Sequence, residues 1–383
     1  MVTLQTAENA LKSVYLGTIS DIMNTKINPL LSKIEQTETD VWGKEIHTAC
    51  KVGINGGFGA GTEDGPLPLA NGNNYVQFVS TLKNLYGKIE ISDKAIRAGS
   101  DERGSFTDIL NAEIEGLISA SKFNLGRMLY GDGTGRLSKA VYGGGGIYTV
   151  DNIKYFMPGM RVDVEVNNKI LHTGLKVDKV NYDESKVSLD GLSETYDNMY
   201  LYVQGSKGNE ITGIGAIFGN SEYLYGNKRS DIASILPTIK AHNGPIDEIL
   251  IQEVIDKIEN NANATVDFIG VSADVKYAYQ EYMAQYKRNI DIMNLEGGFK
   301  SLSFNGIPLV YDRFIENGSM YILDTTKFKL HRLCDWRFLE NINGKILHQS
   351  EGKPVYTATL VKYCDLICSN PLGQAKITGI SRV

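Results

Sequence analysis

The sequence is poor in cysteine and has no long apolar run. Its 383 residues include four cysteines, Cys50, Cys334, Cys364 and Cys368, without the spacing of a disulfide framework. So little cysteine in a long chain is typical of folding in a reducing cytoplasm. No stretch approaches the roughly eighteen apolar residues that a membrane-spanning helix needs, and the N-terminus has no secretory signal pattern. We therefore expect a protein made in the cytoplasm, with no membrane partner.

Motifs of catalysis are missing as well. The sequence has no HExxH, GxSxG or GxxxxGK[ST] motif, and its GxGxG runs at Gly57 and Gly131 do not complete a dinucleotide fingerprint. His331 and the cysteines that follow it lack the two-residue knuckles of a zinc site. We predict no catalytic residue, no cofactor and no metal, and the chain is not expected to be an enzyme. An enzyme whose site no motif reveals stays an alternative.

Strong charge of either sign is also absent. Lys and Arg number 39 against 45 Asp and Glu, which gives a formal net charge of -6. An acidic chain gains nothing from counterion release on DNA, so binding to nucleic acid over a broad basic face is not expected. Such a chain tolerates DNA nearby without sequence-specific binding.

Glycine, by contrast, is abundant and clustered. Strand-like runs at 41–52 and 75–91 flank a segment with seven glycines between Gly53 and Gly72, plus Pro66 and Pro68. A structureless loop of about twenty residues is unusual inside a compact domain. We therefore predict a long hairpin whose tip becomes ordered against an adjacent copy. The candidate subunit contacts are Gly53, Gly57, Phe58, Gly61, Pro66, Pro68 and Tyr75.

The segment 105–130 is the clearest helix. Ser105 and Asp108 form an S-x-x-D capping box, and apolar residues recur along one stripe from Phe106 to Leu129. Gly131 follows as a C-terminal stop. A helix from Phe106 to Tyr130 would be about 37 Å long at the usual rise, so it is expected to span the molecule.

The first forty residues are predicted to form an arm. Apolar residues repeat at helical spacing from Leu4 to Met23, and Pro29 interrupts the pattern. Both an ordinary surface helix and an arm that packs on a neighbouring copy fit this pattern.

The spacing of apolar residues changes from about residue 155 onward. Residues 155–203 alternate apolar and polar positions in short runs, which predicts a small antiparallel barrel or sandwich bounded by glycine-rich joints at 143–146 and 205–219. The remainder is predicted to be mixed α/β, with Pro245 opening one helix and Ser272 capping another. Strands are expected at 307–311, 320–323, 328–333 and 355–368. The last is apolar on both faces, which indicates a central strand.

Four segments resemble tailed-bacteriophage major capsid proteins of the HK-97 type. They are TLKNLYGKIEISDKAIRA (81–98), LNAEIEGLISASKFNLGRMLYGDGTG (110–135), GGFKSLSFNGIPLVYDRF (297–314), and LHRLCDWRFLE with GKPVYTATLVKY (330–340 and 352–363). The likeness covers nearly the whole chain and is to capsid proteins of phages that infect low-GC Gram-positive bacteria.

The resemblance implies an α+β fold with named parts. These are an N-terminal arm (1–40), an extended E-loop hairpin (41–92), a peripheral domain with the spine helix (93–150), a β-rich insertion domain (151–235), an axial domain (236–330) and a return to the peripheral domain (331–383). It also implies a major capsid protein that assembles as pentamers and hexamers into an icosahedral shell around phage dsDNA, in the virion.

Two departures from the family limit this inference. Some relatives carry a cleaved N-terminal scaffolding domain, whereas the short arm here implies a separate scaffolding protein, alongside a portal. Other relatives form a lysine–asparagine cross-link from the E-loop, but the tip from Gly53 to Gly72 has no lysine, so no such cross-link is expected. The alternatives are an encapsulin shell that houses a cargo enzyme and a surface- or glycan-binding protein built on the β-rich domain.

Overall fold

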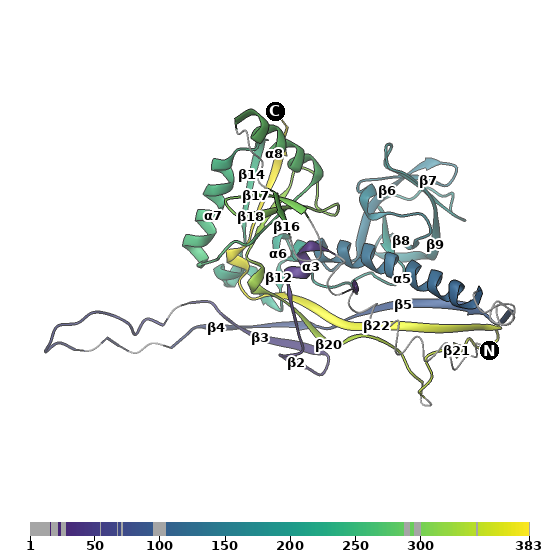
Figure 1. Cartoon of the computed structure of the whole chain (residues 1–383), viewed down its shortest axis with the longest axis horizontal. Helices are drawn as coiled ribbons and strands as arrows, with labels where there is room; N and C mark the ends of the chain where they lie inside the picture. Colours follow the sequence, from purple (N-terminus) through teal and green to yellow (C-terminus); the bar gives the residue numbers. More distant parts are fainter. Residues whose placement is uncertain are drawn as a thin grey trace.

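The computed structural model describes residues 16, 22–23, 28–53, 55–66, 68–69, 72–94, 105–286, 292–294, 300–341 and 344–382. The chain is α+β, as expected. It contains a long sheet with one long helix, a second sheet with two helices, a closed barrel and a hairpin that projects from one end (Figure 1). None of the described helices combines the length and the apolar character that crossing a bilayer takes.

The long sheet is built around one strand. β22 (Val355–Cys368) pairs on one side with β20 (Phe328–Phe338) and on the other with β5 (Lys83–Ser92), so the predicted central strand is confirmed. The short strands β1 (Glu35–Thr37) and β21 (His348–Gln349) complete the sheet. β22 needs both faces apolar because it is covered on both faces and flanked on both edges.

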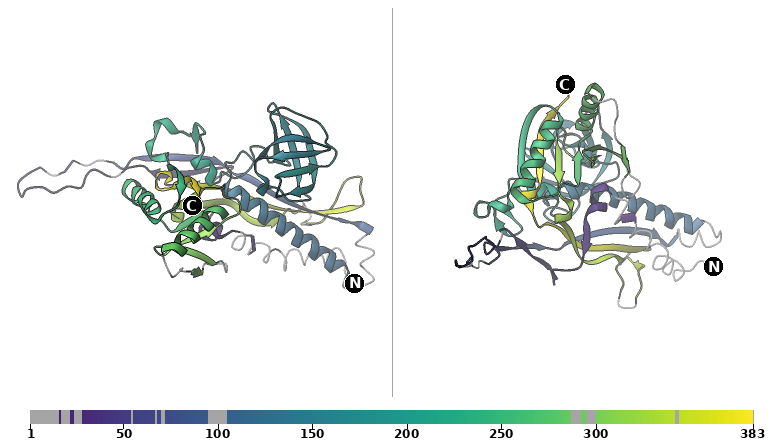
Figure 2. Two further views of the ribbon diagram at one scale, coloured as in Figure 1. Left: turned by 90° about the horizontal axis from the view of Figure 1, so that it is seen from above. Right: turned by 60° about the vertical axis from the view of Figure 1, so that its left-hand side comes forward.

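The long helix α5 (Ser105–Tyr130) has the predicted bounds and runs along β5 and β22 (Figures 1 and 2). Its capping box and the apolar residues 106–110 lie where side chains are not described. From Ile114 onward the apolar stripe packs into the largest core cluster. Gly87 of β5 gives the helix room here, since an added Cβ would lie 2.8 Å from Leu117 Cδ1 and that side chain would have to shift. The helix therefore lies close against the sheet.

The second sheet has seven strands in the order β14-β23-β19-β15-β18-β17-β16. Their bounds are Thr238–Pro245, Ala375–Ser381, Met320–Leu323, Phe268–Val271, Ile307–Tyr311, Lys300–Phe304 and Ile292–Asn294. The helices α7 (Glu248–Ala262) and α8 (Ala273–Tyr286) pack on it. Pro245 was expected to open α7 but ends β14 instead, because Asp247 caps the helix by accepting from Leu250 N.

The six-stranded barrel closes in the order β10-β7-β6-β11-β8-β9. The strands are β6 (Arg136–Gly144), β7 (Ile147–Val150), β8 (Arg161–Val166), β9 (Lys169–Asn181), β10 (Lys186–Leu189) and β11 (Met199–Val203). It therefore starts before residue 151, where the sequence placed the boundary. Glycines 143–146 are not a joint but the turn between β6 and β7, with positive φ at Gly144, Gly145 and Gly146.

The described part of the N-terminal region lies on the long sheet. Met23 is buried in the main core, α3 (Pro29–Lys33) follows, and β1 pairs in parallel with β20. The predicted apolar stripe from Leu4 to Tyr15 lies outside the described residues. The small elements α6 (Ile214–Phe218), β12 (Tyr223–Leu224) and β13 (Asn227–Lys228) follow the barrel.

Candidate subunit-contact hairpin

The root of the projecting hairpin is a three-stranded sheet. β2 (Val41–Trp42), β3 (Glu45–Lys51) and β4 (Tyr75–Thr81) pair in that order, with β3 and β4 in register from Glu45↔Thr81 to Lys51↔Tyr75. Its apolar face belongs to a small separate core of Ile46, Cys50, Phe78, Leu82, Leu224, Tyr225, Ile235 and Ile367. The Phe78 and Tyr225 rings stack at 5.3 Å, and Val79 N donates to the Tyr225 carbonyl at 3.0 Å. The root is thus fixed to the body.

A buried carboxylate fixes the root a second time. Asp365 of β22 accepts hydrogen bonds from Ser80 Oγ at 2.5 Å and from Thr212 N at 2.6 Å. Burial raises the pKa of this carboxyl, although the hydrogen bonds oppose that shift. The side chain therefore joins β4, β22 and the chain that leaves the barrel at one point.

The distal segment of the hairpin, residues 52–74, has no such support. The backbone bond from Val52 N to the Asn74 carbonyl, at 3.0 Å, is the last rung across the hairpin among the described residues. Beyond it the two legs come near each other at one point, where a Cβ added to Gly59 would lie 3.5 Å from Pro68 Cγ. Figure 1 and the left-hand view of Figure 2 show the hairpin extending away from the body.

Large apolar side chains stand on this projection without burial. Phe58 is 98% exposed and Leu69 is 89% exposed, and at the root Trp42 is 73% exposed. A cluster of exposed apolar groups on a monomer marks an interaction surface more often than single scattered ones do. These exposed groups are therefore open to contact with another molecule.

All seven predicted contact residues lie on this one hairpin. Tyr75 is the first residue of β4, and the other six lie in the distal segment, so the fold places them on a single projection. Their role as contacts stays a prediction. Trp42 and Leu69 were not among the predicted residues, although Leu69 follows Pro66 and Pro68 in the same apolar–proline run.

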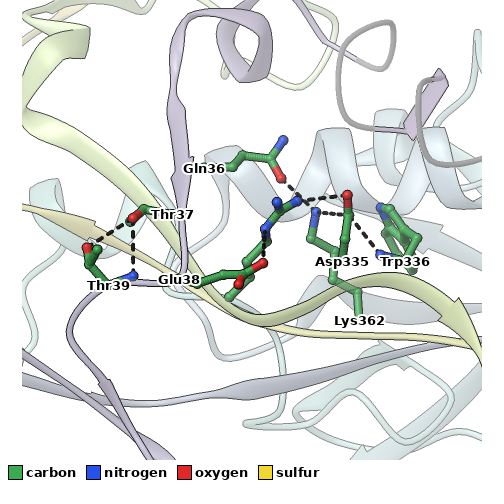
Figure 3. A network of polar contacts seen from close by, with 8 residues as sticks. Gln36, Thr37, Glu38, Thr39, Asp335, Trp336 and Lys362 are labelled. Carbon is green, nitrogen blue, oxygen red and sulfur yellow. Dashed lines mark hydrogen bonds and ion pairs between the residues drawn. The ribbon is translucent and has the colours of Figure 1, made fainter.

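The N-terminal segment is attached to the body by a polar network (Figure 3). Lys362 of β22 is buried and donates to Gln36 Oε1 at 2.7 Å and to Asp335 Oδ1 at 3.3 Å. Arg332 binds Glu38 at 3.4 Å and Asp335 at 2.8 Å. Burial lowers the pKa of Lys362, and the nearby Asp335 carboxylate opposes that effect. These contacts hold β1 along β20.

A second attachment lies at the start of α3. Asn28 accepts from Leu30 N at 2.8 Å as the helix cap, and its amide donates to the Asp312 carboxylate. Asp312 also accepts from Phe314 N at 2.9 Å. Burial raises the pKa of Asp312 to about 6, against the opposing effect of these donors. One carboxyl thus links the N-terminal segment to the loop after β18.

The histidine and cysteines considered as zinc ligands do not come together as a ligand set. Cys364 and Cys368 are buried in β22, and burial raises the pKa of the Cys364 thiol to about 12. His331 faces the Thr39 carbonyl, with 3.0 Å from Nδ1 to that oxygen. Within the described ranges no group of three or more His, Cys, Asp or Glu side chains is arranged to hold a metal. The cysteines of β22 pack as small hydrophobes.

No family model and no curated protein matches this sequence. Solved structures do match its fold. The cyanophage A-1(L) capsid asymmetric unit is 10% identical, covers 95% of this chain and 93% of its own, and gives a TM-score of 0.55. The capsid of an empty GTA particle is 9% identical over 93% of this chain and 90% of its own, with a TM-score of 0.50.

An encapsulin complex from Synechococcus elongatus PCC 7942 also matches, with 10% identity, coverage of 93% and 89%, and a TM-score of 0.48. Identity near one residue in ten bears on fold alone. The first two matches align over at least 90% of each chain. The chain therefore has the fold of phage and GTA capsid proteins.

Proposed function

We propose that this chain is the major capsid protein of a tailed phage. In this proposal it assembles as pentamers and hexamers into an icosahedral shell that encloses dsDNA, and its role is structural. The capsid fold over nearly the full chain supports the proposal, and the sequence segments that resemble HK-97-type capsid proteins agree with it. The observation that carries it is the hairpin, which exposes Phe58 and Leu69 at a distance from the body.

The shape of the molecule favours a ring. The hairpin leaves one end of the long axis, while α5, β5 and β22 run from the centre to the other end, where the last residue of β5 pairs with the first of β22 (Figure 1). A contact between two different patches is heterologous, and it closes into a ring when the rotation between copies allows. Pentamers and hexamers are such rings. A two-fold contact would instead need a self-complementary patch.

The named parts follow as proposals. Residues 1–40 act as the arm, 41–92 as the E-loop, and 93–150 with 331–383 as the peripheral domain around the spine helix. Residues 236–330 form the axial domain and residues 151–235 the insertion domain, whose barrel also takes in β6 and β7 from the end of the segment 93–150. The net charge of -6 supports enclosure of DNA without sequence-specific binding. A separate scaffolding protein and a portal complete the proposed particle in the host cytoplasm.

Electron microscopy of the purified protein tests this function. We expect closed shells, and particles from infected cells that contain DNA. A protein that stays monomeric at every concentration tried, with or without its scaffolding protein, would exclude a shell. Shells that co-purify with a cargo enzyme in place of DNA would identify the encapsulin alternative.

A further inference from the structure

A groove lies where the chain that follows the barrel meets the first strand of the seven-stranded sheet. It runs between the end of α6, the turn after β13 and the start of β14, and it has a volume of about 560 Å³. Four apolar side chains line it, those of Ile217, Leu236, Pro237 and Ile239. Leu236 is 43% exposed and Ile239 is 52% exposed, so the apolar part of the lining is open to a ligand.

A buried cation also lines this groove. Arg229 is only 9% exposed. Its Nη2 group donates to the Ala216 carbonyl at 2.5 Å, whereas its Nε group has no hydrogen-bond partner in the part of the chain that the structure describes. A guanidinium has five N–H donors, so Arg229 is held against α6 with donors left over.

The charge of Arg229 has no carboxylate partner among the described residues. Glu222 lines the same groove, but its carboxylate pairs with Lys228 at 3.1 Å. Burial lowers the pKa of Arg229, and the group that opposes this shift is the Tyr225 hydroxyl, not a carboxylate. The guanidinium is therefore removed from water without a compensating anion from its own chain.

Two other deeply buried cations do have such partners. Arg127 binds Glu210, and Lys362 binds Asp335 at 3.3 Å. A buried charge is costly unless it is paired and hydrogen-bonded, which explains why these two are paired. Arg229 differs from them in lying on a groove, where an anion from outside the chain can reach it.

We propose that this groove is an oxyanion site, in which Arg229 binds a carboxylate or phosphate group and Leu236 and Ile239 contact the apolar part of the same ligand. A guanidinium binds such groups through charge-assisted hydrogen bonds, which are stronger than those between neutral groups. The oxyanion can come from a free small molecule or from an acidic side chain of another copy. The site does not depend on the proposed shell function, since Arg229 lacks a counter-ion within the described part of the single chain.

Binding of hexanoate to the unassembled chain tests the site. Hexanoate joins a carboxylate to a short apolar chain, whereas hexanol has a chain of the same length without the charge. In isothermal titration calorimetry at constant ionic strength, we expect hexanoate to bind at one site per chain and hexanol not to bind. A wild-type chain that binds neither hexanoate nor inorganic phosphate would overturn the proposal.

Two variants and a control assign the binding to Arg229. Arg229→Gln keeps a donor for the Ala216 carbonyl but removes the charge, so it should weaken hexanoate binding about tenfold or more. Ile239→Glu leaves Arg229 in place and supplies a carboxylate within the groove, so it should weaken binding as much, even where Arg229→Gln does not fold. Ile249→Glu adds the same charge on α7, outside the groove lining, and should bind as the wild type does. Wild-type affinity in Ile239→Glu would contradict the proposal.

Assembled particles distinguish the two sources of the oxyanion. Hexanoate that binds the unassembled chain but not the shell would support the site and show that a side chain of another copy fills it. Hexanoate that binds both equally would support the site as one for a free ligand. A wild-type protein that forms no shells would remove the proposed function but leave the result on the unassembled chain standing, so the two proposals fail separately.

Discussion

At the scale of single residues, the fold depends on a few buried charges that join distant parts of the chain. Arg127 near the end of α5 and Glu210 after the barrel form a bidentate ion pair, and each side chain is only 2% exposed. Breaking a buried pair by removing one partner is costly because the other charge is left without compensation. This pair links the long helix to the chain that leaves the barrel.

Glu210→Gln should therefore destabilise the monomer by about 3–5 kcal/mol. The measurement is denaturant unfolding followed by circular dichroism. The control is Glu253→Gln, which breaks the exposed pair between Lys240 and Glu253 and should cost less than about 1 kcal/mol. Equal losses of unfolding free energy in the two variants would show that the buried pair stabilises the fold no more than the exposed pair does.

Asp312 makes stability depend on pH in a defined direction. Its pKa is about 6 in the folded chain, above the roughly 3.9 of an unfolded aspartate. Between these values the folded state binds more protons, so the contribution of Asp312 to stability falls as pH rises and levels off above the folded pKa. Two pKa units correspond to about 3 kcal/mol.

Asp312→Asn should remove that part of the pH dependence. Unfolding free energies of the wild type and the variant, measured at about pH 4 and pH 7, should show a smaller fall with pH in the variant. The comparison concerns slopes, because losing the carboxylate also weakens the contacts with Asn28 and Phe314 at every pH. Identical slopes would refute this role for Asp312.

At the scale of elements, the two ends of the hairpin should differ in dynamics. In hydrogen exchange, the amides of β3 and β4 should be protected in the monomer because they form the ladder from Glu45 to Lys51. Amides from Gly53 to Gly72 should exchange freely in the monomer and slowly in assembled shells. Full protection of that segment in the monomer would show that a single chain orders it unaided.

The sequence predicted an element correctly where its local residue pattern and its tertiary contacts favour the same secondary structure. The bounds of α5 and β22 could be found in advance, because one has an uninterrupted apolar stripe and the other is apolar on both faces. The start of α7 could not, since Pro245 and Asp247 both suit a helix start and only β23 pairing holds Pro245 in a strand. Glycines 143–146 fit both a joint between domains and a tight turn, and the distinction depends on the pairing of β6 with its neighbour β7 and with the distant β11.

The position of the candidate contact hairpin in the chain could be predicted, but the residues that pack around its root and along the body could not. A glycine-rich run between two strands can be recognised from the sequence alone, so the seven contact candidates could be named. The pocket between α5, β5 and the chain after β11 could not be predicted, because its lining residues Asn84, Leu117, Gln204 and Trp336 come from four separate parts of the chain. Nothing in the sequence indicated that Asp365 holds the hairpin root or that Lys362 holds the N-terminal segment. In the sequence each is a single polar residue within an apolar strand.

At the scale of the whole molecule, we expect the proposed shell to be held by packing without covalent bonds between copies. The distal segment contains no lysine, and Cys50, Cys364 and Cys368 are buried, so neither an amide cross-link from the hairpin tip nor a disulfide through these thiols is available. Wild-type particles boiled in detergent with a reductant, which keeps the partly exposed Cys334 reduced, should run as a single band near 42.2 kDa. A ladder of bands above the monomer would show covalent linkage and contradict this expectation. A shell of this kind should also dissociate on dilution in mild denaturant, because each contact is reversible and its occupancy follows subunit concentration.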